Sequence, residues 1–567
     1  PPLPKQNRNT STMNIPALRC LFSIFFLALA FPGFAAEYYW VGGSGNWSDT
    51  DHWATTSGGA TFHAQPPGEE DDVFFDDNSF TGAGQVVTID VEDAFCRDLS
   101  WAGAAGTPVL RGAADRSLHL FGSLTFIADM TIDFAGTLRF ESTPLSAFVR
   151  EITTAGQLLP GDVRFDGNDG QWALNDDLEI AGALILERGT LGTNDHTLTC
   201  AQFISDNARS RRLNLTRSRM VLRNPAGDTV RWTARADNFT LEARNAAIEF
   251  QDPAQMENQG DGFLEYHQLT FEADATIDCS NFVDLRIDTL RLQRNATLQN
   301  DMQIISLEIG RGYECRFASG RNFIIRQLLA EGGCEGYVSL RSTVDGQAAF
   351  IQSAFDFSNS YLILRDIHNA GATTFLADNS IDLGNNDGWI INSPDPRTLY
   401  WVNDGGDWYD TDHWSLSSGG PGGECPPTPL DDIIFDAASF PSPNQVVRGM
   451  EGPQYYAHDM TWLPGTRTPT LQLPAIQLFG SLRLDNPLNL DLPLLHLRST
   501  ERDNTLLFAD QEMEEVRFEG SGSWMIQDPL TADLLTHLRG ELNTDGQPIT
   551  IERYQALGEP AKTLALS

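Results

Sequence analysis

The sequence predicts an all-β fold of two tandem right-handed parallel β-helix (β-solenoid) units, each preceded by a Trp- and Gly-rich cap. The first observation behind this prediction is an internal repeat: YYWVGGSGNWSDTDHW at 38–53 returns as LYWVNDGGDWYDTDHW at 399–414. A later segment, RGTLGTNDHTLTCAQFISDNARSRRLNL at 188–215, aligns without a gap with 539–566. Repetition on this scale is typical of an extended array of structural units.

The second observation is a dense series of short strand patterns. Apolar and polar residues alternate in runs such as TIDFAGTLRFE (131–141) and YLILRD (361–366), and residues that favour turns bound each run. Long helical periodicity is missing. We therefore expect helix to make up under about 10% of the chain outside its leader, well below the globular norm.

The third observation is the spacing of these runs. Leu213, Leu241 and Leu269 lie at equal intervals in similar short strands. Coils of about 20–30 residues are the size of parallel β-helix turns. A β-sandwich also has alternating strands, but a strand-rich unit of about 300 residues is too long for one sandwich. The right-handed prediction follows the strong preference of parallel crossover connections.

The N-terminal segment has the pattern of a secretory leader. Residues 1–12 have no initiator Met and no apolar pattern, and we interpret them as an upstream extension that precedes the true start. Residues 13–35 are predicted to be a signal peptide, with Arg19 before the apolar run LFSIFFLALAF and a small-x-small cleavage site ending at Ala35. That apolar run is too short to cross a bilayer as a stop-transfer helix, so no membrane span is expected after its removal.

The mature chain divides at the repeat. We predict a cap at 36–95, a β-helix at 96–396, a second cap at 397–457 and a truncated second β-helix at 458–567. An open β-helix end exposes unpaired strand edges, which a cap with large aromatic side chains can protect. The aromatic residues expected to cover the first coil of each unit are Trp40, Trp47, Trp53 and Trp101, then Trp401, Trp408, Trp414 and Trp462.

The charge balance limits the partners. The chain has 38 basic and 77 acidic residues and a formal net charge of −39. Nucleic acids and anionic membranes are poor partners for such a surface, because binding a polyanion needs clustered cations. Solubility is the simplest explanation of the charge, and divalent-cation binding or tolerance of high salt are the functional alternatives.

The cysteines do not form a zinc pattern, because neither a C-x-x-C motif nor paired histidines occur. Cys96 aligns with Ala457 and Cys200 with Ile551, which predicts that these two thiols are small core side chains. Cys315 and Cys334 lie about one coil apart in the sequence. They could stack or form a disulfide, and buried free thiols are an equal alternative.

The Trp-rich block resembles a known repeat. YWVGGSGNWSDTDHW followed by a Gly-rich loop and DDVFFD is similar to the repeat of large secreted surface proteins of the Bacteroidota. GTLGTNDHTLTCAQFISDNARSRRLNL resembles the coils that follow in them, and LGNNDGWII at 383–391 resembles their unit ending. The resemblance implies parallel β-helix units in an adhesin-like, Sec-exported protein that type IX secretion delivers to the cell surface. It implies no site residues.

The best candidate for chemistry is the loop Asp49-Thr50-Asp51-His52, repeated at 410–413. Alternating carboxylates in a Gly-rich loop could bind a structural Ca²⁺ ion. The interpretation we favour is that the aspartates cap turns and that His52 forms hydrogen bonds between Trp47 and Trp53. Asp71-Asp72, repeated at 431–432, is interpreted as a turn and strand-edge device. We assign no catalytic, cofactor-binding or metal-binding residue.

These patterns favour a secreted or cell-surface structural or adhesive protein, located outside the cell or on its outer surface. The alternative is a β-helix protein that binds or degrades glycans as a polysaccharide lyase or hydrolase does, with paired carboxylates on one strand face. The two units share mainly Trp, Gly, Phe, Leu and turn Asp residues, while the polar strand positions differ. This favours a protein without enzymatic activity. We expect its partners to be surface glycans or other cell-surface proteins.

Overall fold

The computed structural model describes most of the chain after residue 34. The predicted extension 1–12 and nearly all of the predicted signal peptide 13–35 lie outside the described residues. These are 35–141, 148–279, 283–330, 332–450, 452–463, 465, 467–485, 488–558 and 561–566. In these ranges the only helices are two 3-10 turns, η1 (Thr50–His52) and η2 (Thr411–His413), so the low helix content is confirmed there.

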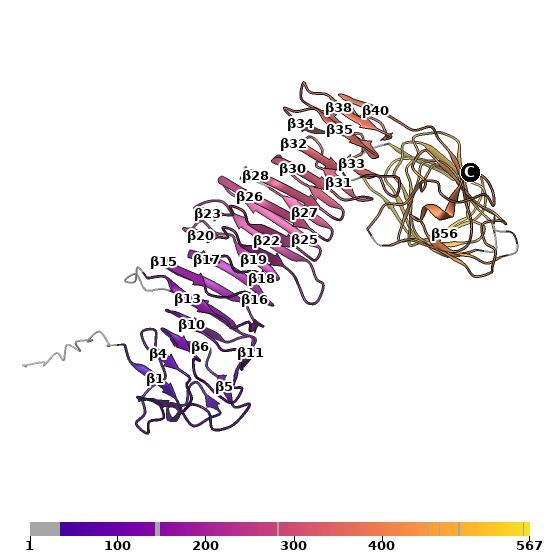
Figure 1. Ribbon diagram of the computed structural model, residues 1–567. Coiled ribbons are helices and arrows are strands. Elements are labelled where there is room, and N and C mark those ends of the chain that lie inside the picture. Colours follow the sequence, from indigo (N-terminus) through magenta and orange to yellow (C-terminus); the bar gives the residue numbers. More distant parts are fainter. Residues whose placement is uncertain are drawn as a thin grey trace, which may run out of the picture.

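The first unit is a stack of parallel coils. One of its sheets contains β14 (Leu158–Leu159), β16 (Leu178–Ile180), β18 (Leu198–Cys200), β21 (Arg219–Leu222), β24 (Ala247–Phe250), β26 (Gly262–Phe271), β28 (Val283–Leu292), β30 (Met302–Ile309), β32 (Asn322–Ala330), β34 (Ala349–Gln352) and β37 (Ile367–Asn369) in that order. Each strand pairs in parallel with the equivalent strand of the next coil (Figure 1). The all-β, parallel β-helical fold class is therefore confirmed.

The register stacks like residues above one another. Ile248, Leu269, Leu290 and Leu307 are successive register partners, and all four are buried. A ladder of this kind buries each apolar side chain against its neighbours above and below, which a single coil cannot do. Leu213 and Leu241 are also register partners.

One predicted alignment of coils is wrong. Leu269 belongs to a different sheet from Leu213 and Leu241, because its partner is Ile248 of β24. The equal spacing of the three leucines came from coils of unequal length rather than from one continuous ladder.

The Trp-rich segment at the start of each unit forms the first coils of its stack. β1 (Glu37–Trp40) pairs in parallel with β4 (Asp72–Phe74), and β3 (Trp53–Ala54) folds back against β1 in antiparallel pairing. In the second unit β41 (Thr398–Trp401) pairs in the same two ways with β44 (Asp432–Phe435) and β43 (Trp414–Ser415). All eight tryptophans predicted to cover the first coils are buried. Figure 1 places β1 at one end of the first stack.

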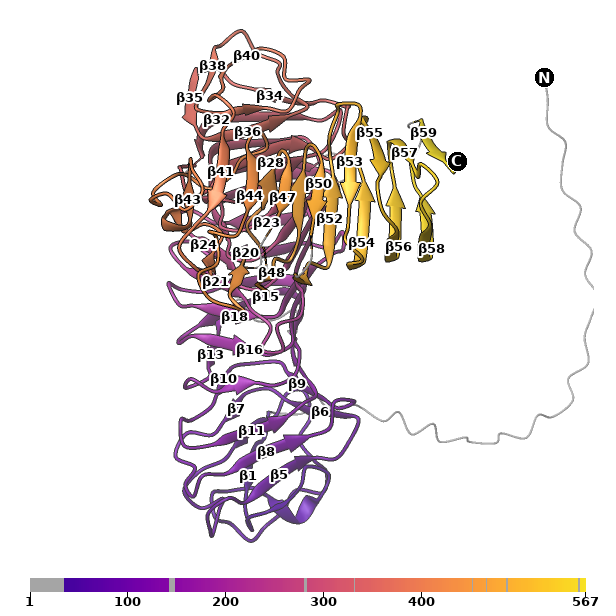
Figure 2. The ribbon, with the colours of Figure 1, turned by 90° about the vertical axis from the view of Figure 1, so that its right-hand side faces the viewer.

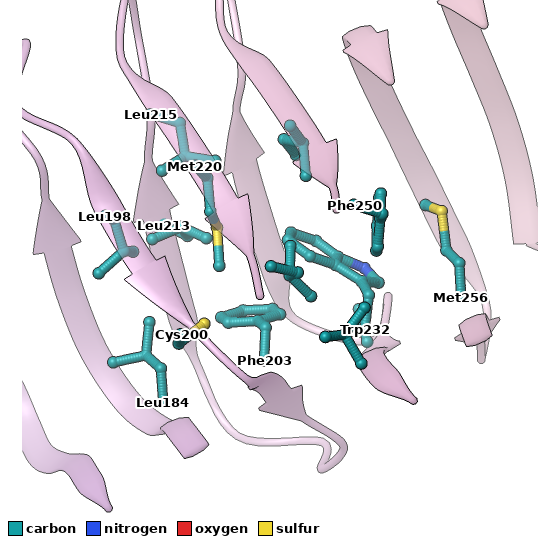
Figure 3. Packing of buried hydrophobic residues seen from close by; sticks show 14 of the residues in the cluster. Leu184, Leu198, Cys200, Phe203, Leu213, Leu215, Met220, Trp232, Phe250 and Met256 are labelled. Carbon is teal, nitrogen blue, oxygen red and sulfur yellow. The ribbon is translucent and has the colours of Figure 1, made fainter. Parts of the chain in front are cut away.

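The interior of the stack is apolar. Figure 3 shows Leu184, Leu198, Phe203 and Trp232 projecting into one shared core, with the Cys200 thiol among them. Cys96 and Cys200 are buried free thiols, as the repeat alignment predicted. A free thiol in such surroundings behaves as a small apolar side chain.

The second unit does not continue the first stack. β40 (Trp389–Asn392) ends the first unit, and the buried residues of the second unit form a core cluster of their own. Figure 1 shows the second unit nearly end-on beside the last coils of the first, and Figure 2 shows it from the side. The two stacks therefore cross, and outward strand faces of both become an interface.

A disulfide bond links the units across this junction. Cys334, in the loop after β32, is bonded to Cys425 of the second unit. Cys315 is a buried free thiol on β31 (Glu314–Phe317). Of the alternatives that the sequence left open for Cys315 and Cys334, a bond between the two is therefore wrong, because Cys315 points into the core while Cys334 lies at the junction.

Candidate functional site: the cleft between the two units

The Asp-rich loops of the two caps are built as turns. The Asp49 carboxylate accepts a hydrogen bond from the Asp51 backbone N–H at 3.1 Å, and Asp410 accepts one from Asp412 at 3.0 Å. Each aspartate caps the 3-10 turn that follows it. This is the turn role that the sequence favoured over Ca²⁺ binding.

The histidine of each loop stacks on a tryptophan. The His52 ring lies on Trp40 with centroids 4.5 Å apart, and its Nδ1 is 2.6 Å from the Val41 carbonyl oxygen. The predicted place between Trp47 and Trp53 is wrong, because the antiparallel return of β3 puts His52 over β1. The ring explains Gly45, where a Cβ atom would lie 2.1 Å from His52 Nε2.

The paired aspartates at 71–72 and 431–432 tie strand ends together. Asp431, almost fully buried, accepts hydrogen bonds from Arg397 Nη2 at 2.8 Å and from the Thr428 hydroxyl at 2.7 Å. Asp72 accepts one from Arg97 Nε at 2.7 Å. Both carboxylates therefore hold the ends of neighbouring strands together, which is the turn and strand-edge role predicted for them.

One group of side chains has the composition of a metal site. Asp432, His458 and Asp459 lie close enough together to offer three ligand atoms. The corresponding positions of the first unit include Asp72 and Arg97, which form an ion pair. His458 Nδ1 is 2.9 Å from Asp432 Oδ1, so the histidine takes the place of that arginine. The group is thus explained by pairing between coils.

The junction of the two units brings together several buried charged side chains. Its apolar part consists of Ile363 and Ile381 of the first unit against Tyr456 and Phe479 of the second. These are outward-facing positions of both stacks, which each unit alone would expose. Their burial shows that the junction is a packed interface.

The first unit contributes an arginine ladder to the junction. Arg316 on β31, Arg341 on β33 (Val338–Ser342) and Arg365 on β36 (Leu362–Arg365) are successive register partners. Arg341 and Arg365 are buried. Neighbouring strands lie about 4.8 Å apart, so the ladder stacks three like charges at close range.

Carboxylates beside the ladder offset part of this charge. Glu314, only 3% exposed, accepts a hydrogen bond from Arg316 and lies 3.7 Å from Arg341. Asp345 is hydrogen-bonded to Arg341 and lies 3.4 Å from Arg365. Burial would raise the pKa of Glu314, but the charges of Arg341 and Arg316 outweigh it and hold that pKa below its ordinary value.

The second unit meets the ladder with residues that follow its parallel strands. β52 (Leu494–Leu497) is followed by Arg498, and β54 (Glu512–Phe518) by Glu519; Arg498 Nη2 is 2.7 Å from Glu519 Oε2. Burial would raise the pKa of Glu519, but His496, whose Nδ1 is 3.2 Å from Oε1, outweighs it together with Arg341 and Arg517 and holds that pKa below its ordinary value. β56 (Leu530–His537) is followed by Arg539, which donates a hydrogen bond to the backbone oxygen of Asp345 in the first unit.

A cleft of about 690 Å³ opens between these groups. Both units line it, and its charged lining is richer in arginine than in carboxylate. The lining residues are Arg316, Arg341, Ser342, Thr343, Val344, Asp345, Gln347, His496, Arg498, Arg517, Glu519, Leu538, Arg539, Leu557 and Gly558.

Sequence reasoning missed this cleft. The arginines of the ladder are separated by about one coil each, and that spacing is visible in the sequence. The docking of one unit on the other is not, because it depends on how two stacks cross.

No family model, no curated protein and no solved structure matches this chain. Across the part of the chain that the structure describes, none of the helices is long and apolar enough to span a membrane.

Proposed function

We propose that this protein is a secreted or cell-surface structural protein, an adhesive β-solenoid that presents its outward strand faces to surface glycans or other cell-surface proteins. The observation that supports this most is the parallel stack of coils in each unit. Its interior is apolar along both units, so the outward faces are its ligand-accessible surface. Stacked coils create extended surfaces of this kind, which repeat proteins use for binding.

The outward charges support a structural role. Cross-strand pairs such as Arg111–Asp133 at 2.7 Å and Arg291–Glu308 at 2.7 Å link register partners on neighbouring coils. Such pairs stabilise a sheet by a few tenths of a kcal/mol, up to about 1 kcal/mol each. Carboxylates with this arrangement hold coils together, and we propose that the protein works without catalytic turnover.

The disulfide bond between Cys334 and Cys425 supports an extracytoplasmic location. Structural disulfides form and persist in oxidising compartments and are rare in the reducing cytosol. The bond also joins the two units, so oxidation would complete the assembled surface after export.

The test is the location of the protein on intact cells. Antibodies against 36–567 should label intact cells of the source organism, and brief protease treatment of those cells should remove the label. A cytosolic marker protein should survive the same treatment. Detection only after lysis would contradict the proposal.

A further inference from the structure

The cleft between the units has a surplus of positive charge that its own carboxylates do not fully offset. Its charged lining contains five arginines, and the carboxylates among its lining residues are those of Asp345 and Glu519. Glu314 and Glu515, which do not line the cleft, pair with its Arg316 and Arg517, and Asp366 pairs with Arg365 beside it. The surplus stands out in a chain whose formal net charge is −39.

Comparison of the two units identifies Arg539 as the arginine that produces this surplus of positive charge. Arg188 of the first unit occupies the position of Arg539, and its Nε donates to Asp166 at 2.5 Å. In the second unit Glu519 occupies the position of Asp166. Its Oε2 lies 2.7 Å from Arg498 Nη2, so Glu519 pairs with Arg498 and not with Arg539. Among the described residues, no carboxylate oxygen lies within ion-pair distance of Arg539; its hydrogen bond goes to a backbone oxygen across the junction.

Two further arginines have donors without acceptors. Arg341 is 9% exposed and Arg498 is 6% exposed, and the Nε group of each has no hydrogen-bond partner in the described structure. A buried donor without an acceptor costs about 1–3 kcal/mol, and more for a charged group. Both side chains line the cleft, so a ligand with several acceptor oxygens could accept hydrogen bonds from charged donors that have no partner within the protein.

We propose that this cleft binds a single acidic sugar unit, one that bears a carboxylate or a sulfate. Guanidinium groups bind such oxyanions through two parallel hydrogen bonds, which favours arginine over lysine at such sites. The cleft volume of about 690 Å³ is large for an oxyanion alone and is in the range of small-molecule sites. Binding in this cleft rests on the proposed contact with glycans only for the class of ligand; it is a property of the purified chain and does not depend on where the protein is located.

The rest of the lining fits a sugar. The exposed side chains of Thr343 and Gln347 offer a hydroxyl and an amide to sugar hydroxyl groups. Val344 and Leu557, which are 38% and 49% exposed, offer apolar surface to the C–H face of a pyranose ring. A long polyanion is disfavoured, because the acidic surface beyond the cleft would repel its other charges.

The experiment is ligand titration of purified 36–567, followed by calorimetry and saturation-transfer NMR. The probes are methyl glucuronoside, glucose 6-sulfate, the neutral methyl glucoside and sodium sulfate. We expect saturable binding of one or both acidic sugars at one site per chain, at least about tenfold tighter than inorganic sulfate, and no saturable binding of the neutral sugar.

Variants locate the site. Arg539→Gln and Val344→Glu should each weaken binding by about tenfold or more. Arg188→Gln makes the same change at the equivalent position of the first unit and should leave the affinity unchanged. If Arg539→Gln disturbs the docking of the units, Val344→Glu still tests whether the ligand binds in the cleft. Val344 lies on an exposed turn, so its replacement should leave the docking intact.

Three results would overturn the proposal. The first is the absence of saturable binding for both acidic sugars. The second is equal affinity for sodium sulfate, which would mean an adventitious ion only. The third is equal weakening by Arg188→Gln and Arg539→Gln, which would mean binding through overall charge.

Discussion

Cys334 and Cys425 form a disulfide bond whose Cα atoms are 5.1 Å apart although 91 residues separate them in the chain. Cys334 lies between β32 and β33, among the last coils of the first unit. Cys425 lies between β43 and β44, in the first coils of the second unit. The bond therefore ties the docking of the two crossing stacks covalently, beside the packed interface between them. The arginine ladder and the cleft both depend on that docking.

Replacing both cysteines should loosen the docking and leave each stack folded. In the chain-entropy view, a disulfide closing a loop of this length stabilises by up to about 4–5 kcal/mol. We expect Cys334→Ser/Cys425→Ser to melt in two transitions and to show a larger radius of gyration by small-angle X-ray scattering. Reducing agent should do the same to the wild type and nothing further to the variant. An unchanged radius would show that the packed interface alone fixes the docking.

Each Trp-rich cap should stabilise only the unit to which it belongs, because its tryptophans are buried in the core of that unit. Trp53 Nε1 donates a hydrogen bond to the Trp47 carbonyl oxygen at 2.8 Å, and Trp414 does the same to Trp408 at 2.7 Å. Both indole rings are fully buried. Truncating either to alanine should cost about 3–5 kcal/mol, as for other buried aromatic residues.

Calorimetry separates the two effects. Trp53→Ala should lower the melting temperature of the first unit, and Trp414→Ala that of the second, in the background without the disulfide. A melt of 36–567 that neither substitution changes would contradict the assignment of these residues to the core.

The sequence allowed the stack to be predicted because stacking is local. Alternation places residues such as Ile248 and Leu290 inside, and each coil meets its neighbours about 20–30 residues away. The turn role of Asp49 was predictable for the same reason, since its partner is two residues away.

The cleft could not be predicted because its parts are distant. Arg316 and Arg365 occupy outward positions, which on a lone stack would face solvent. Only the crossing of a second stack buries Arg341 and Arg365 of this ladder, while Arg316 stays exposed, and brings Arg539 to Asp345, 194 residues away in sequence. Cys334 was misleading for a similar reason: the nearer Cys315 points into the core, and the actual partner lies across the junction.

The Asp-rich loops should not depend on metal ions. Because the Asp49 carboxylate already accepts a backbone hydrogen bond, its turn is complete without a cation. We expect EDTA and added Ca²⁺ to leave the melting temperature of 36–567 unchanged, and Asp51→Asn to have little effect. A Ca²⁺-dependent rise in melting temperature that disappears in Asp51→Asn would establish the calcium site instead.

Acid should weaken the junction through Glu314. Its pKa is held below the ordinary value of a glutamate, so its contribution to stability is complete above the unfolded-state pKa and is lost as the pH falls through the lower, folded-state pKa. The loss should therefore begin below about pH 4.3, the ordinary pKa of glutamate. Glu314→Gln removes the buried charge that faces Arg341 and Arg316 and should cost about 3 kcal/mol at pH 7.

The measurement is the difference in unfolding free energy between wild type and Glu314→Gln, from urea titrations at a series of pH values. That difference should shrink as the pH falls below about 4, because the wild-type glutamate is then protonated too. Glu335→Gln is the matched control: its ion pair with Arg311, at 2.8 Å, is exposed, so its removal should change little at any pH. A difference for Glu314→Gln that stays constant down to pH 3 would mean that its charge does not hold the ladder in place.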